Sequence, residues 1–237
     1  MAFRRPDGAL GRRGSRGPVT ELVRFADVEP GPWANGGGVT WELARGPSAS
    51  PRWDWRISIA AVEAPGPFST LPGVDRTLVC LGPEPLALTV ADAVQIVPPF
   101  GSVTFTGEEA VAATSTTATR DLNVMTRRGR AVAEVAVVDV DPGVEAEVLA
   151  DAADLTVVVA LDGRTAIAEP AALGPDGPPT PLAPGDAVLF DHLDARLRVR
   201  GSGLVCLVRI QTRRRRGSRS VRFPNGTNRS ATVSLRE

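Results

Sequence analysis

Short alternating segments separated by prolines and glycines constrain the fold of this chain most tightly. In the segment 53–62, WDWRISIAAV, apolar and polar side chains alternate, which is typical of a β-strand with two different faces. Shorter apolar segments follow at 77–81, 85–90 and 94–97, with turn-forming residues between them. The connection 63–76 is too rich in proline and glycine to form a helix. Short strands at this spacing predict an all-β sandwich or barrel.

The alternation in 53–62 also predicts that the two faces of this strand differ in chemistry. The predicted faces are Trp53, Trp55, Ile57 and Ile59 on one side, and Asp54, Arg56, Ser58 and Ala60 on the other. If both faces are covered, a charged group and a hydroxyl point into an enclosed space. A buried arginine needs a partner, which is either a carboxylate of the protein or an acidic ligand. The tryptophans on the opposite face are expected to pack in a core or at a barrel end.

Three consecutive glycines, Gly36 to Gly38, follow Asn35. Such a run costs backbone entropy, so it predicts a loop that bends sharply or approaches another group closely. The loop lacks the lysine and the spacing of a phosphate-binding loop and opens no helix, which argues against nucleotide binding.

Missing residue types exclude several kinds of chemistry. All 27 basic residues are arginine, so Schiff-base and lysine-nucleophile mechanisms are excluded, and there is no tyrosine. The one histidine, His192, cannot form a common zinc site by itself, so we expect neither a metal nor a cofactor. Cys80 and Cys206 lie in similar apolar segments, and we expect two reduced core residues, with a disulfide as the alternative.

Charge is distributed unevenly along the chain. Residues 1–18 hold five arginines and one acidic residue, and 211–237 hold eight arginines and one acidic residue, so the middle of the chain is acidic. We expect both termini to be disordered. The alternative is an interaction module in which the arginine runs bind phosphates, although Phe223 is the one stacking group in the C-terminal run. No apolar run could span a membrane and no signal sequence is recognised, so we expect a cytoplasmic protein.

Several unusual motifs occur in a fixed order, namely WANGGGVT (33–40), WRISIA (55–60), GPFS (66–69), PGVDR (72–76) and DLNVMTRRG (121–129). Together they resemble the HutD/Ves family of bacterial bicupin proteins, and this resemblance covers approximately residues 19–210. It implies an all-β bicupin, in which two jelly-roll (RmlC-like cupin) β-barrels pack together. The first barrel, with the ligand pocket, is expected within 19–130 and the second within 131–210.

The resemblance also implies a function. Members look like metal-independent, non-catalytic proteins that bind a small molecule and modulate histidine utilisation. Metal-dependent cupins instead use two or three histidines with a carboxylate, which this chain cannot supply. The implied partner is a small carboxylate such as N-formylglutamate, with a homodimer as a further option. We expect no membrane contact, and nucleic-acid contact only through the arginine-rich termini.

Arg56 and Arg76 are the strongest candidates for anion recognition, because a guanidinium matches a carboxylate at two points. The structural alternative for Arg56 is an ion pair with Glu42 or Asp121. The alternative for Arg76 is pairing with Asp75 or a loop carbonyl.

Polar groups that could complete the site come from the loop and two strands. Asn35 and Asn123 would bond an amide or formyl group, Ser58 would form the floor, and the loop at Gly37 would close the mouth. Each asparagine could instead hold its own loop together through Asx-turn bonds.

A metal-independent enzyme, an isomerase or hydrolase of a small acid, is the competing function. Its base would be Asp, Glu or His192. A carboxylate facing Arg56 is expected to be held ionised and poorly basic, which argues against this function. Ser58 and Ser69 lie in no motif with a histidine base, so a serine hydrolase is not expected.

Overall fold

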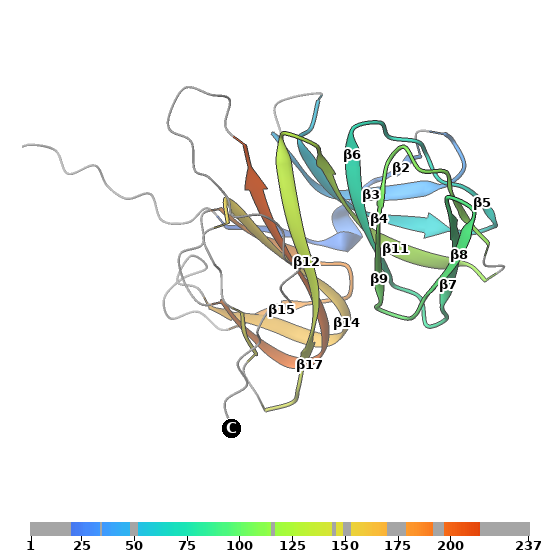
Figure 1. Ribbon diagram of the computed structural model, residues 1–237. Helices are drawn as coiled ribbons and strands as arrows, with labels where there is room; N and C mark the ends of the chain where they lie inside the picture. Colours follow the sequence, from blue (N-terminus) through green and yellow to red (C-terminus); the bar gives the residue numbers. More distant parts are fainter. Residues whose placement is uncertain are drawn as a thin grey trace, which may run out of the picture.

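The computed structural model describes residues 20–33, 35–47, 52–114, 117–143, 146–148, 153–169, 179–191 and 197–213. Over these residues the fold is all-β, with one short 3-10 turn at Phe25–Asp27. Two halves lie side by side (Figure 1). None of the described segments forms a helix with the length and apolar character that a membrane crossing requires. The extension 1–18 and nearly all of 211–237 lie outside the described residues.

The first half is built from two antiparallel sheets. The strands of the six-stranded sheet, in spatial order, are β2 (Pro30–Pro32), β3 (Val39–Gly46), β4 (Trp55–Val62), β11 (Thr119–Arg127), β6 (Val74–Cys80) and β9 (Ser102–Thr106). Those of the four-stranded sheet are β5 (Gly66–Pro67), β10 (Val111–Ala113), β7 (Leu86–Val90) and β8 (Ala93–Val97). An apolar cluster that includes Leu78, Leu86 and Phe105 fills the space between the two sheets.

The second half is one seven-stranded sheet that wraps around its own apolar cluster, which includes Ile167, Phe190 and Leu197. A β-bulge lies in β14 between Ala160 and Asp162, and bulges bend strands. The main path of the sheet is β1 (Thr20–Val23), β16 (Ala187–Asp191), β14 (Leu155–Glu169), β17 (Leu197–Thr212) and β12 (Ala131–Val140), with β13 (Ala146–Val148) on β17 and β15 (Thr180–Leu182) on β14.

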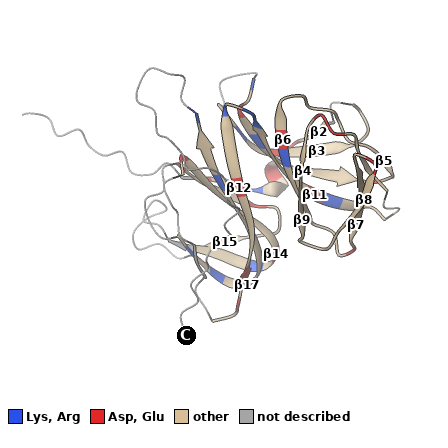
Figure 2. Cartoon of the chain, in the orientation of Figure 1, with Lys and Arg blue, Asp and Glu red and all other residues tan. Residues whose placement is uncertain are grey.

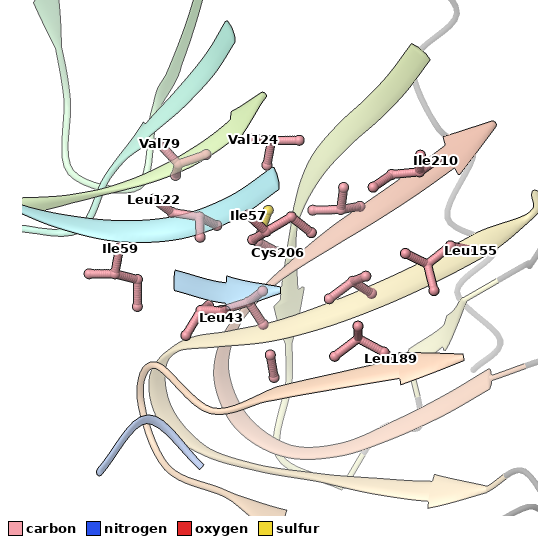
Figure 3. Packing of buried hydrophobic residues seen from close by; sticks show 14 of the residues in the cluster. Leu43, Ile57, Ile59, Val79, Leu122, Val124, Leu155, Leu189, Cys206 and Ile210 are labelled. Carbon is pink, nitrogen blue, oxygen red and sulfur yellow. The ribbon is translucent and has the colours of Figure 1, made fainter. Parts of the chain in front are cut away.

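A third apolar cluster, the seam, joins the two halves (Figure 3). Ile57, Ile59 and Leu122 contribute to it from the first half, and Leu189 and Cys206 contribute from the second. Since these side chains point out of the first half, the inner faces of the same strands are free for other residues.

The first strand crosses over to the second half. β1 pairs with β16 in antiparallel register, from Thr20 opposite Phe190 to Val23 opposite Ala187. Leu22 packs on the cluster of the second half and Val23 on the seam. The expected boundary, which assigned 19–130 to the first barrel, is therefore wrong for this strand. The burial of its apolar side chains explains the crossover.

Asp186 anchors the end of β1. It follows the Pro184–Gly185 turn, and its carboxylate accepts hydrogen bonds from Arg24 Nη1 at 2.6 Å, the Phe25 amide at 2.9 Å and the Ala183 amide at 3.0 Å. The residue is only 3% exposed. Its removal would leave two backbone N–H groups without these acceptors.

We predict that Asp186→Ala lowers the free energy of unfolding by about 3 kcal/mol, because partly buried donors lose a charged acceptor. Urea unfolding measures this change. The control is Asp27→Ala, at an exposed acidic residue three positions after Arg24, which should change the stability by less than about 0.5 kcal/mol. Equal stability of the two variants would show that Asp186 does not anchor β1.

Candidate functional site

Three neighbouring strands, β4, β11 and β6, place a set of polar side chains on one inner face. Met125 of β11 lies opposite Arg56 on one side and Arg76 on the other. Two residues along β11, Asn123 lies between Ser58 and Leu78. The side-chain period of two therefore brings these groups to the interior of the first half, while Ile57 and Leu122 face the seam.

These side chains line a cavity of about 70 Å³ in the first half. An aromatic and aliphatic wall, which includes Trp33 and Phe68, encloses its other side. The cavity is small for a whole drug-sized ligand, which typically needs about 300 Å³ or more. The full lining is Pro32, Trp33, Thr40, Arg56, Ser58, Ala60, Phe68, Ser69, Leu71, Arg76, Asp121, Asn123 and Met125.

Arg76 is the buried cation of the cavity. Its Nη2 donates to Asn123 Oδ1 at 2.7 Å, and its Nη1 donates to the Ser69 carbonyl at 3.4 Å. Its guanidinium carbon also lies 5.4 Å from the ring centre of Phe68 and 4.9 Å from that of Phe105. Burial lowers the pKa of Arg76 to about 10, although the charge of Asp121 partly offsets this effect.

Asp75 and Arg76 are adjacent on β6, where Figure 2 shows an acidic residue next to a basic one, but they have different partners. Asp75 pairs with Arg128 at 2.6 Å and not with Arg76. Of the two structural alternatives for Arg76, the structure therefore shows the loop carbonyl.

Asp121 is a fully buried carboxyl group on the cavity wall. Its Oδ1 accepts a hydrogen bond from Asn123 Nδ2, while its Oδ2 has no hydrogen-bond partner in the described part of the chain. Burial raises the pKa of Asp121 to about 7, which outweighs the opposing effects of Arg76 and the Asn123 hydrogen bond. The expectation that a carboxylate facing Arg56 is held ionised does not extend to Asp121, because desolvation exceeds the attraction of Arg76.

Arg56 lies nearer the surface, and its side chain is 21% exposed. Its Nε is 2.9 Å from Glu42 Oε2, an ion pair by distance but without the angle that a hydrogen bond needs. Glu42 also lies 3.3 Å from Arg45 Nε. Within the described chain we find no hydrogen bond from the two terminal nitrogens of Arg56, so they can receive a ligand.

The glycine loop lies next to the cavity wall without lining it. Asn35 Oδ1 accepts from the Gly37 amide at 3.1 Å, and Asn35 Nδ2 donates to the Pro67 carbonyl at 3.0 Å. Asn35 and Gly37 are exposed and absent from the cavity wall, so the Asx-turn alternative describes Asn35. At Gly38 a Cβ atom would lie 2.6 Å from Trp33 Cε2, and this explains why a glycine stands there.

Four of the six expected ligand-binding residues therefore come together at the cavity, namely Arg56, Ser58, Arg76 and Asn123. Phe68 and Asp121 also line the cavity, but they were not among the expected ligand contacts. The D-x-N pattern of Asp121 and Asn123 was the available signal, because residues two apart on a strand share a face.

The two cysteines and His192 are the other candidates from the sequence, and neither cysteine is among the residues that line the cavity. Cys80 and Cys206 are free and buried in different clusters, and burial raises the pKa of both thiols, that of Cys206 to about 12. His192 lies outside the described residues. Within the described residues, no group of three or more His, Cys, Asp or Glu side chains is placed to hold a metal ion.

The two-part all-β architecture and the interior cavity define a protein of the cupin class. A cupin 2 conserved barrel domain protein from Leptotrichia buccalis has a similar fold, with a TM-score of 0.51 at 11% identity over 82% of this chain and 97% of that chain. The HutD family model matches residues 25–207, and the chain belongs to the HutD family.

Solved structures agree with this assignment. HutD from Pseudomonas fluorescens SBW25, in a formate condition, superposes with a TM-score of 0.68 at 23% identity, over 82% of this chain and all of that chain. A conserved protein of unknown function from Pseudomonas aeruginosa PAO1 gives a TM-score of 0.67 at 26% identity, over 81% and 98% of the two chains.

Curated relatives match over part of their length. Protein Ves of Citrobacter koseri is 38% identical over 123 residues, which is 49% of this chain and 64% of that protein. An uncharacterised 21.2 kDa protein from the hutC 3′ region of Pseudomonas putida is 36% identical over 93 residues, 38% of this chain and 49% of that protein. The chain thus spans about half to two thirds of these relatives.

The raised pKa of Asp121 predicts a pH-dependent stability. Between about pH 4 and 7 the folded chain binds more protons at this site than the unfolded chain, so the contribution of Asp121 to the free energy of unfolding falls as pH rises through this window. The stability of Asp121→Asn relative to that of the wild type should therefore rise by about 2.5 kcal/mol from pH 5 to pH 8, at about 1.4 kcal/mol per unit of pKa.

Urea unfolding of both proteins at pH 5, 6, 7 and 8 measures this difference. A stability difference that stays constant with pH would mean that Asp121 has an ordinary pKa in the folded chain.

Proposed function

We propose that this chain is a non-catalytic binding protein for a small carboxylate, of the N-formylglutamate type, which it senses to modulate histidine utilisation. The observation that carries the proposal is the pair of arginines on the wall of one interior cavity, with Ser58 and Asn123 on the same wall. Because a planar guanidinium can donate two hydrogen bonds to one carboxylate, this arrangement is suited to bind a carboxylate ligand.

Each group has a distinct role in the proposed complex. The terminal nitrogens of Arg56, which form no hydrogen bond with the described residues, grip the carboxylate at the outer part of the cavity. Ser58 and Asn123, which are 1% and 2% exposed, bond the formyl or amide group deeper inside. Arg76 orients Asn123 through its 2.7 Å hydrogen bond and keeps the floor of the cavity positive. The cavity is partly open to solvent, so the rest of the ligand extends out of it.

Two comparisons support the choice of ligand class and pathway. A relative is encoded in the hutC 3′ region of Pseudomonas putida, and the HutD structure from Pseudomonas fluorescens comes from a formate condition. Formate is the smallest carboxylate, and it exceeds a formyl group by one oxygen atom.

Isothermal titration with N-formyl-L-glutamate, glutarate and formate tests this function. We expect Arg56→Ala to weaken binding of N-formyl-L-glutamate by about 10- to 100-fold, as the loss of a charged hydrogen bond implies. The matched control is Arg45→Ala, since Arg45 contacts the same Glu42 but lies outside the cavity wall. An unchanged affinity in Arg56→Ala, or an equal loss in both variants, would contradict a direct grip by Arg56.

One observation favours a second candidate, a metal-independent enzyme that isomerises or hydrolyses a small acid. The raised pKa of Asp121, about 7, suits a general acid or base better than an ordinary carboxylate does. In that case turnover would survive a chelator and would be lost in Asp121→Asn while ligand binding remained. Binding of the same acids without turnover in the wild type would exclude the enzyme.

A further inference from the structure

A carboxyl group is an unexpected neighbour in a cavity that suits anions. Asp121 is fully buried, and its one hydrogen bond comes from the neutral amide of Asn123. The nearest buried cation, Arg76, donates its side-chain hydrogen bonds to the same amide and to the Ser69 carbonyl, and not to Asp121. Among the described residues the Oδ2 atom of Asp121 has no hydrogen-bond partner, although the residue lines the cavity.

The charged and titratable groups around Asp121 come from the strands on either side of it. From β4 comes Arg56, which is already paired with Glu42, and from β6 come Arg76 and the neutral thiol of Cys80. The remaining lining from β2, β3 and the loop before β6 is uncharged. Glu42 also meets Arg45, but Glu42 and Arg45 are more than a third exposed, so water screens their charges.

The deep part of the cavity therefore holds one cation, Arg76, and one acid, Asp121. A ligand carboxylate on Arg56 would be a second anion in the same cavity, whose wall includes both Arg56 and Asp121. Like charges at close range disfavour the ionised form of both, and the effect is strong where water is excluded. A proton on Asp121 removes the conflict. It also leaves Oδ1 as the acceptor for Asn123 and makes the unpartnered oxygen a hydrogen-bond donor.

We propose that the anionic ligand enters this cavity together with one proton, which Asp121 carries. Asp121 is then a specificity-determining residue, because it decides the pH range in which the cavity accepts an anion. This inference rests on the proposed binding function. For each ligand bound, one proton passes from solvent to the Asp121 carboxylate, and no covalent bond of the ligand changes. The pKa of Asp121, about 7, places this uptake near neutral pH.

Isothermal titration of the full chain with N-formyl-L-glutamate and with formate tests the coupling. Titrations at pH 8 in HEPES and in Tris, which have different ionisation enthalpies, give the number of protons bound. We expect nearly one proton taken up per ligand at pH 8, and clearly fewer at pH 6. The affinity should fall about tenfold from pH 8 to pH 9, as the linkage of one proton requires. Both ligands stay ionised over this range, so the proton is not theirs.

Asp121→Asn separates this role from a merely structural one. Its amide resembles the protonated carboxyl, so the variant should bind N-formyl-L-glutamate at pH 8 about tenfold more tightly than wild type and take up no proton. The matched control is Asp92→Asn, at an exposed turn far along the chain from the cavity residues, which should keep the wild-type proton uptake.

Two outcomes overturn the inference, and they can be told apart. Binding by the wild type at pH 8 with no proton uptake would overturn it and leave the proposed function standing. No binding of any of the carboxylates between pH 6 and 8 would overturn the proposed function and the coupling with it. If Asp121→Asn does not fold, the number of protons that the wild type takes up on binding still tests the inference.

Discussion

The register of β11 between β4 and β6 is the constraint on which the rest of this structure depends. With Asn123 opposite Ser58 and Leu78, the polar side chains of β4 and β11 in the cavity wall face inward, while Ile57, Ile59 and Leu122 of the same strands face the seam. A slip of one residue would exchange the two faces. It would then place buried charges in the seam and isoleucines in the cavity. The same register thus holds the two halves together and assembles the site.

The burial of charged groups in this cavity costs free energy in the folded chain. Arg76 and Asp121 are both buried, and each leaves one polar atom without a partner among the described residues. Replacement of buried ionic groups by apolar residues of similar volume is often neutral or stabilising in other proteins. Since apolar side chains fill the rest of the same interior, simple packing does not require these groups here. We interpret them as functional, because a buried polar atom without a protein partner can form a hydrogen bond with a ligand.

Sequence patterns predicted the parts of this structure that depend on local periodicity. The alternation around Arg56 and Ser58 correctly separated them from Ile57 and Ile59, because the side-chain period of a strand is a local property. The role of Asn35 was left open, since an asparagine beside glycines suits both a loop and a ligand. Two features escaped prediction: β1 crosses to the second half through long-range pairing, and the state of Asp121 follows from burial that only the tertiary structure creates.

The most direct test of the account is a crystal structure of the chain with N-formyl-L-glutamate, grown near pH 6. The account predicts density for the ligand in the first-half cavity, with a carboxylate within hydrogen-bond distance of the terminal nitrogens of Arg56 and the formyl group toward Ser58 and Asn123. A ligand bound instead in the cleft between the halves, beside Arg45 and Arg130, would contradict it. So would a cavity that stays empty at saturating ligand.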